Sequence, residues 1–365
     1  MPLQVTIASA APTCNRQLAD LSVQFVKRGA TLRTHTSWDC SGQPNEARGP
    51  AERFLSWFPH GTGLGRACDF ALDLGLPATD VLVCVNYPSL LAIPPLALLR
   101  RPKVIYYCLE TVKDAMGIAL ETALCRRTAA QVLVPEENRA RALQSRLGKR
   151  CAVHVIPNVP YLRAGVPRPG KLREYLAPRV PRKDLTIVLY SGVYHAYNRL
   201  EHIITSAAAW PSTICLVLML AGRYPNSLRD LVTTSGSRAV IVPPVGTGEL
   251  FDWIADADIG LLPYEDKDDI NVQFCAPQKL FDYLACGIPF IGSRRPSIQA
   301  VEQEFGCGLS IDMTDSAALA EAVMILGGDS VLRRVMAEKA RKAHIEKYHY
   351  ERYITPICSR IFAFN

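Results

Sequence analysis

The sequence contains no apolar run of about 18 residues, the length that a membrane-spanning helix requires. Its first residues, MPLQVTIASAAP, lack the basic stretch and the longer apolar run of a secretion signal. The 12 cysteines are scattered without a Cys-x-x-Cys pair, so neither a disulfide framework nor a zinc site is indicated. We therefore expect a cytoplasmic protein with reduced, mostly buried thiols and no bound metal.

The sequence also lacks the motif of a nucleic-acid-binding module, and its basic residues are dispersed, so we expect no nucleic-acid partner. Residues 1–160 carry 18 basic against 12 acidic side chains, residues 161–185 carry 7 against 2, and the remainder carries 16 against 20. This basic first half fits an ordinary solvated surface. It also fits an anionic partner, such as a nucleotide, a lipid-linked phosphate or the headgroups at the inner face of a membrane.

The chain is long enough for two domains, and strand-like apolar runs alternate with helical runs in both halves. Strands separated by helices predict parallel βαβ units, and a proline-rich basic stretch divides the alternation. We expect an α/β fold of two Rossmann-like domains that face each other across a cleft. The predicted parts are a domain at 1–160, a basic proline-rich linker at 161–184, a second domain at 185–345, and a helix at 346–365 that packs back on the first domain.

The segment PYEDKDDINVQFCAPQKLFDYLACGIPFIGS carries the clearest chemical pattern. Pro277 suits the first turn of a helix, and Gly287 suits its end. A loop that leads into a helix N-terminus presents backbone N–H groups to an anion, and this loop contains Cys275 and Ala276.

Two side chains of the same helix add to this pattern. Lys279 brings positive charge, and Asp282 can accept two hydrogen bonds from a ribose diol. Together with the helix N-terminus, these parts suit a nucleoside diphosphate. The alternative from the residues alone is a strand–helix–strand corner with a surface lysine.

The string PQKLFDYLACGIP, preceded by ADADIGLLPY, resembles the donor-site signature of group 1 (GT4-like) glycosyltransferases, which have the GT-B fold. The resemblance implies that Asp282 holds the nucleotide ribose and that Lys279 lies near the phosphates. The first acid of the family's Glu-x7-Glu pattern falls on Phe274, so the usual contact to the sugar hydroxyls is absent or comes from another residue. The resemblance also implies retention of configuration, no metal, a UDP- or GDP-sugar donor and no permanently bound cofactor.

The resemblance extends over residues 130–312. TIVLYSGVYHAYNRLEHIITSAA resembles the strand, glycine loop and helix that open the family's second domain, with Gly192 in the loop. The arginine and lysine that commonly neutralise the diphosphate are missing from that loop, and Arg199 is a stand-in. Arg223, after the next strand, is a second candidate for a phosphate, and the loop ending at Val245 corresponds to the place where the nucleobase stacks.

The resemblance makes the first domain the acceptor-binding domain, and an inverting enzyme would need a general base there. Glu110, at the end of the run VIYYCLE, is the first candidate, and His60 and His35 are the others. In a retaining enzyme, Glu110 would position the acceptor instead. Asp256 and Asp258 superficially match a metal-binding Asp-x-Asp, but they lie at a helix-to-strand junction, which favours a structural role.

The sequence therefore favours a glycosyltransferase that moves a sugar from a nucleoside-diphosphate sugar to a hydroxyl of a glycan, a lipid-linked acceptor or a small molecule, with polysaccharide biosynthesis as one setting. Two alternatives stay open. One is an enzyme like the sugar-nucleotide 2-epimerases, which share the architecture. The other is a catalytically silent GT-B module that binds a nucleotide or a partner protein, which the missing acid and the missing arginine and lysine would fit.

Overall fold

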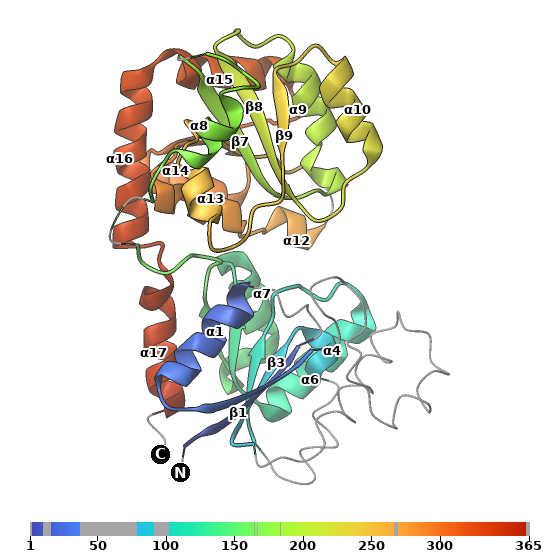
Figure 1. Ribbon diagram of the computed structural model, residues 1–365. Coiled ribbons are helices and arrows are strands. Elements are labelled where there is room, and N and C mark those ends of the chain that lie inside the picture. The colour runs from blue at the N-terminus through green and yellow to red at the C-terminus, as the bar shows by residue number, and fades with distance from the viewer. Residues whose placement is uncertain are drawn as a thin grey trace. The chain divides into compact units, whose positions relative to one another are not determined.

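The computed structural model describes residues 2–9, 16–36, 79–90, 102–163, 165, 167–182, 184–265 and 269–362. The chain divides into two compact units (Figure 1). Unit 1 comprises Met1–Pro157 together with Tyr353–Asn365, and unit 2 comprises Asn158–Arg352.

Unit 1 is built on a parallel sheet whose strands lie in the order β2-β1-β3-β4-β5-β6. The central strand β3 is the apolar run VLVCV, and all five of its residues are buried, as expected for a parallel strand covered on both faces. The strands are β1 (Gln4–Ser9), β2 (Thr31–Thr36), β3 (Val81–Val85), β4 (Lys103–Tyr107), β5 (Ala129–Val134) and β6 (Ala152–Val155).

Helices cover the sheet of unit 1, and sequence-local caps fix where several of them begin. Asp114 accepts a hydrogen bond from the Gly117 N–H, and Glu136 accepts from the N–H groups of Asn138 and Arg139. The helices are α1 (Arg16–Lys27), α4 (Tyr87–Leu90), α6 (Ala115–Thr128), α7 (Glu137–Leu147) and the 3-10 turn η1 (Gly148–Arg150). The last helix of the chain, α17 (Tyr350–Phe362), brings Phe362 to 5.8 Å from Phe25 between ring centroids.

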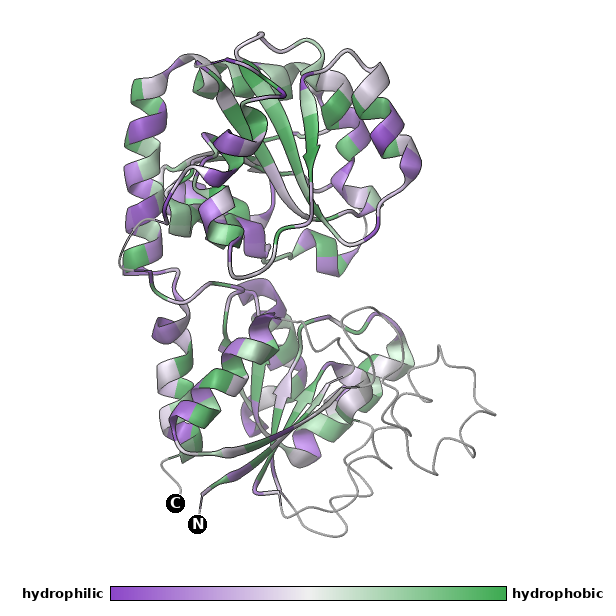
Figure 2. Cartoon of the chain, viewed as in Figure 1, coloured by the Kyte–Doolittle hydropathy of each residue, from purple (hydrophilic) through white to green (hydrophobic). Residues whose placement is uncertain are grey.

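Unit 2 contains a second parallel sheet, in the order β12-β11-β10-β7-β8-β9. Chain order therefore reverses between β7 and β10, as in a Rossmann sheet. The strands are β7 (Thr186–Val193), β8 (Ile214–Ala221), β9 (Ala239–Val242), β10 (Ile259–Leu262), β11 (Phe290–Ser293) and β12 (Gly308–Ile311). Figure 2 shows these strands as the most hydrophobic part of the unit.

The helices of unit 2 pack on both faces of this sheet, and α13 packs closely against α16. They are α8 (Lys171–Leu176), η2 (Ala196–Asn198), α9 (Leu200–Ala207), α10 (Asn226–Thr234), α11 (Leu250–Ile254), α12 (Ile270–Gln273), α13 (Gln278–Cys286), α14 (Pro296–Phe305), α15 (Ser316–Gly328) and α16 (Ser330–Glu346).

The segment predicted as a linker contains the short helix α8, which Asp256 holds in place. The Asp256 carboxylate is buried and accepts hydrogen bonds from the N–H groups of Gly170, Leu172 and Arg173, at 2.7, 2.8 and 3.2 Å. Asp258 accepts from the Ile187 N–H at 2.8 Å and pairs with Arg173 at 2.9 Å. The structural role favoured for this Asp-x-Asp pair is thus confirmed.

The apolar patterns of the sequence did not predict three elements: β2, β12 and α14. β2 (TLRTHT) has few apolar residues because it pairs with one neighbour only, at the described edge of its sheet. β12 and α14 lie within a stretch where apolar spacing is irregular. Among the described residues, no helix combines the length and the apolar character needed to cross a membrane. None of the nine described cysteines forms a disulfide, and all nine are buried.

Candidate functional site

The strongest candidate site of unit 2 lies at the carboxyl ends of β7 and β10, where the strand order reverses. Ligands of open α/β sheets bind at such a point because the loops after the two strands diverge to opposite faces. Gly192 lies within the last residues of β7, and Arg199 lies in the segment that follows the strand. The loop after β10 begins with Pro263 and Tyr264. The sequence motif Pro277–Gly287 forms α13 beside them.

Gly192 and Lys279 are in close contact at this point. Gly192 has a φ of +144°, a backbone conformation that favours glycine. A β-carbon added to Gly192 would lie 3.1 Å from Cε and 3.2 Å from Nζ of Lys279. The missing side chain therefore leaves the space that the lysine occupies.

The Lys279 ammonium group lies in an aromatic setting. Its Nζ donates to the Tyr190 hydroxyl oxygen at 3.1 Å and lies 4.2 Å from the Tyr190 ring centre and 5.4 Å from the Tyr264 ring centre. Burial lowers the pKa of Lys279 to about 7, because removal of water disfavours the charged form. No carboxylate of the described residues lies within salt-bridge distance of this lysine.

Hydrogen bonds and stacked rings tie the two loops of the switch point together. Asn198 Nδ2 donates to the Pro263 carbonyl at 2.7 Å, and the Glu265 N–H donates to the Tyr197 carbonyl at 2.7 Å. The rings of Tyr197 and Tyr264 stack with centroids 6.1 Å apart. These contacts fix the segment after β7 to the loop after β10.

Helix α13 presents its N-terminus at the same place. Pro277 is the N-cap residue in an extended conformation, and Gly287 ends the helix in the left-handed conformation with a φ of +70°. The first N–H groups of a helix have no partner within it and carry partial positive charge. Asp282 lies one turn into α13 and is 5% exposed, so its carboxylate is held among packed side chains.

The residues just before α13 are fixed through their carbonyl groups. The Cys275 carbonyl accepts from the Ser297 hydroxyl, and the Ala276 carbonyl accepts from Asn158 Nδ2, each at 2.6 Å. Phe274 ends α12 and is partly buried. These residues therefore set the path of the chain into the helix N-terminus.

Three other predicted residues, Arg199, Arg223 and Val245, lie in the segments that follow β7, β8 and β9. Arg199 adopts a left-handed conformation, with a φ of +46°, and pairs with Glu265 at 2.9 Å. Arg223 is exposed in the loop after β8, and Val245 is partly buried in the loop after β9. The structure thus brings Gly192 and Lys279 into contact, whereas Arg199 has a carboxylate partner within its own loops.

In unit 1, Glu110 is exposed and follows the end of β4 by three residues. Its backbone N–H donates to Asn86 Oδ1 at 3.0 Å, and Asn86 has a φ of +63° after β3. This bond joins the loops after two neighbouring strands at the carboxyl edge of the sheet. His60 lies outside the described residues, whereas His35 is a residue of β2.

The sequence interpretation missed the aromatic residues of the site, Tyr190, Tyr197 and Tyr264. A signal was present for Tyr190, because residues i and i+2 of a strand point to the same face and Tyr190 shares its face with Gly192. Tyr197 lies in the single turn η2 and Tyr264 in the loop after β10, and neither segment is long enough for a periodic pattern to place its side chains.

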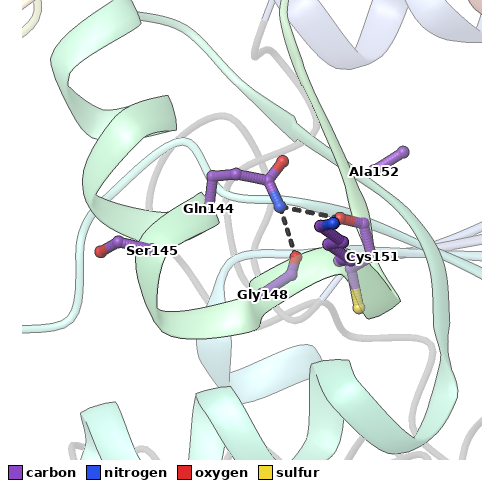
Figure 3. A pocket seen from close by; sticks show the side chains of 6 residues that line it. Gln144, Ser145, Gly148, Cys151 and Ala152 are labelled. Carbon is purple, nitrogen blue, oxygen red and sulfur yellow. Dashed lines mark hydrogen bonds between the residues drawn. The ribbon is translucent and has the colours of Figure 1, made fainter.

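Unit 1 also carries a surface pocket of about 550 Å³, lined by Gln144, Ser145, Gly148, Lys149, Cys151 and Ala152 (Figure 3). Gln144 Nε2 donates to the carbonyls of Gly148 and Cys151 across it, at 2.6 and 3.1 Å. These hydrogen bonds hold the end of α7 to the segment that leads into β6. We assign no ligand to this pocket. Among the residues that the structure describes, no group of three histidine, cysteine or acidic side chains could hold a metal ion.

Known proteins resemble parts of this chain in sequence and the whole of it in fold. A family model described as glycosyl transferase-like matches residues 199–359. N-acetyl-alpha-D-glucosaminyl L-malate synthase of Bacillus anthracis is 32% identical over 171 residues, which cover 46% of this chain and 43% of that protein. The match thus spans less than half the length of this curated relative.

Solved structures match over nearly the whole chain. Sucrose-phosphate synthase of Thermosynechococcus elongatus is similar with a TM-score of 0.75 at 16% identity and covers 100% of both chains. Alr3699/HepE of Anabaena, in complex with UDP-glucose, is similar with a TM-score of 0.71 at 10% identity, covering 99% of this chain and 100% of that one. At such identities the likeness establishes the fold, so the predicted pair of Rossmann-like α/β domains of the GT-B type is confirmed.

Proposed function

We propose that the chain is a glycosyltransferase whose unit 2 binds a nucleoside-diphosphate sugar at the carboxyl ends of β7 and β10. The observation that carries the proposal is the Lys279 ammonium group, which lies against Gly192 at the N-terminal turn of α13. A cation and a helix N-terminus at a switch point form a site for a diphosphate. The glycosyl transferase-like match over residues 199–359 includes α13.

Each part of the site has a role in this proposal. The N–H groups at the start of α13 and Lys279 neutralise the charge that develops on the leaving diphosphate, without a metal. Asp282 accepts hydrogen bonds from the ribose hydroxyls. The loop at Val245 contacts the base, and Arg223 is a second phosphate contact. UDP is the favoured nucleotide, because the similar fold of Alr3699/HepE is in complex with UDP-glucose.

We further propose a GT4-like enzyme that retains the configuration of the sugar. Unit 1 is the acceptor domain, and Glu110 positions the acceptor hydroxyl. The acceptor is a glycan, a lipid-linked intermediate or a small molecule, and the basic first half favours an anionic one. Peripheral contact with the inner membrane face would bring the enzyme to a lipid-linked acceptor.

The test is incubation of the purified protein with UDP-, GDP- and dTDP-sugars, with and without an acceptor extract. A transferase releases nucleoside diphosphate in proportion to acceptor, and proton NMR of the product reports whether configuration is retained. A 2-epimerase converts the sugar nucleotide without an acceptor, which the same NMR spectra detect. Nucleotide binding without any turnover identifies a silent module. If the protein binds none of the three nucleotides, the assignment of the donor site is wrong.

A further inference from the structure

Helix α16 exposes a stripe of side chains with the spacing of a helix-pairing seam. Val331, Val335, Glu338, Lys342 and Ile345 follow one another at steps of four, three, four and three residues, which keeps them on one face. The three apolar members are 59%, 41% and 46% exposed. The opposite face of the helix is buried against its own unit through Met336, Ala340 and Ala343.

In Figure 1, α16 runs along the border of unit 2, with its buried face toward α13. Figure 2 shows hydrophilic and hydrophobic bands alternating along it. The neighbouring helix α15 adds two exposed apolar side chains, Met324 at 50% and Ile325 at 46%. Exposed apolar side chains of this size are typical of an interaction surface where they line one face of a helix, as they do on α16.

The charges of the stripe are complementary to themselves under a two-fold rotation. If a second α16 lies antiparallel with its axis of symmetry between Glu338 and Lys342, each of these residues meets the opposite charge of the other copy. The same register places Val335 against Ile345 and Arg334, which flanks the stripe, against Glu346. A two-fold contact is isologous, so one surface must satisfy itself in this way.

We propose that α16 pairs with the α16 helix of a second copy of this chain, antiparallel, to form a dimer. The register is set by Glu338 with Lys342 of the other copy and by Arg334 with Glu346 of the other copy. Val335 and Ile345 supply the apolar contacts. Within one copy, Lys342 and Glu346 lie 3.9 Å apart and remain 63% and 55% exposed, so both are accessible to a second chain.

The experiment is sedimentation equilibrium of the full chain over a concentration series, with two charge reversals. In a homodimer of Glu338→Lys, the new lysine faces Lys342 of the other copy at two symmetry-related places. In a homodimer of Lys342→Glu, the new glutamate faces Glu338 of the other copy at the same two places. Either change should raise the dimer dissociation constant roughly tenfold or more, because juxtaposed like charges are strongly unfavourable. An equimolar mixture of the two variants should form a heterodimer, because each chain then meets its complement.

The mixture separates pairing between chains from charge effects within one helix, since Glu338 and Lys342 are also neighbours within α16. The double variant Glu338→Lys/Lys342→Glu should dimerise like the wild type. Asp230→Lys, an exposed reversal on α10, is the matched control and should leave the dimer intact. A wild-type chain that stays monomeric throughout the series overturns the proposal, and so does a mixture of the two variants that stays monomeric.

Discussion

Lys279 Nζ lies 3.1 Å from the hydroxyl oxygen of Tyr190 and 4.2 Å from the centre of its ring. Tyr190 is fully buried, and its hydroxyl also lies 2.8 Å from the Val193 carbonyl and 2.9 Å from Asn198 Oδ1. The tyrosine therefore fixes the lysine to the strand end and to the loop that follows it. The position of the cation depends on β7 as much as on α13.

The first prediction concerns this cation. Lys279→Met keeps an unbranched side chain that is one heavy atom shorter and removes its charge, so we expect turnover of the sugar nucleotide to fall by about 100-fold or more. Steady-state kinetics with the active sugar nucleotide measure the effect. Lys339→Met, an exposed lysine on α16, is the control and should leave turnover unchanged. If the two variants have equal turnover, Lys279 does not contribute to the donor site.

The second prediction concerns pH. Since burial lowers the pKa of Lys279 to about 7, the ammonium form is lost as pH rises through 7 in the free protein. Affinity for UDP-glucose, whose diphosphate does not titrate near neutrality, should therefore weaken from pH 6 to pH 8. Bound diphosphate should raise the pKa of Lys279, so binding near pH 7 takes up protons.

Calorimetry in buffers of different ionisation enthalpy measures this proton uptake directly. The uptake should vanish in Lys279→Met. The stability of the free protein should change in the opposite sense. The unfolded chain keeps this lysine protonated up to its ordinary pKa of 10.5, so the cost of burying it falls, and stability rises, as pH increases from about 7 toward 10.5. A Kd for UDP-glucose that is flat from pH 6 to pH 8 would contradict the assignment.

The third prediction concerns the ribose. Asp282→Asn preserves shape in a buried position and removes the charge, so nucleotide affinity should fall roughly 10-fold to 100-fold, the range for hydrogen bonds to charged groups. The 2′-deoxy nucleotide should show a comparable loss with the wild-type protein. It should show little further loss with Asp282→Asn, because both changes remove the same contact. Full additivity of the two losses would place the ribose elsewhere.

The gross fold follows from the sequence because parallel strands buried on both faces are continuous apolar runs, as in VLVCV of β3 and in β8. Gly192 and Lys279 were also predicted as site residues from the sequence, since one lies near the end of a strand and the other in the first turn of a helix. Their contact was not, because it depends on the reversal of strand order between β7 and β10. The partner of Arg199 was hidden for the same reason: Glu265 lies in the loop after the other strand.

The fourth prediction concerns Asp256, which holds α8 to unit 2. Asp256→Ala leaves three backbone N–H groups without their carboxylate acceptor, so we expect the unfolding free energy to fall by at least about 2 kcal/mol. Chemical denaturation measures this loss. The matched variant Asp230→Ala, at an exposed position of α10, should change stability little. If Asp256→Ala folds as stably as the wild type but loses activity in a metal-dependent way, the structural role is wrong.

The fifth prediction concerns the contact between Gly192 and Lys279. Gly192→Ala forces a non-glycine residue to a φ of +144° and places a methyl group 3.1 Å from Lys279 Cε, so the lysine must move. We expect a loss of about 1–3 kcal/mol in stability from backbone strain, together with weaker nucleotide binding. Gly248→Ala is the control, because its added β-carbon meets no atom within 4 Å. Thermal denaturation and a nucleotide titration on both variants separate the two effects: strain alone lowers Tm and spares affinity, whereas displacement of the cation lowers affinity as well.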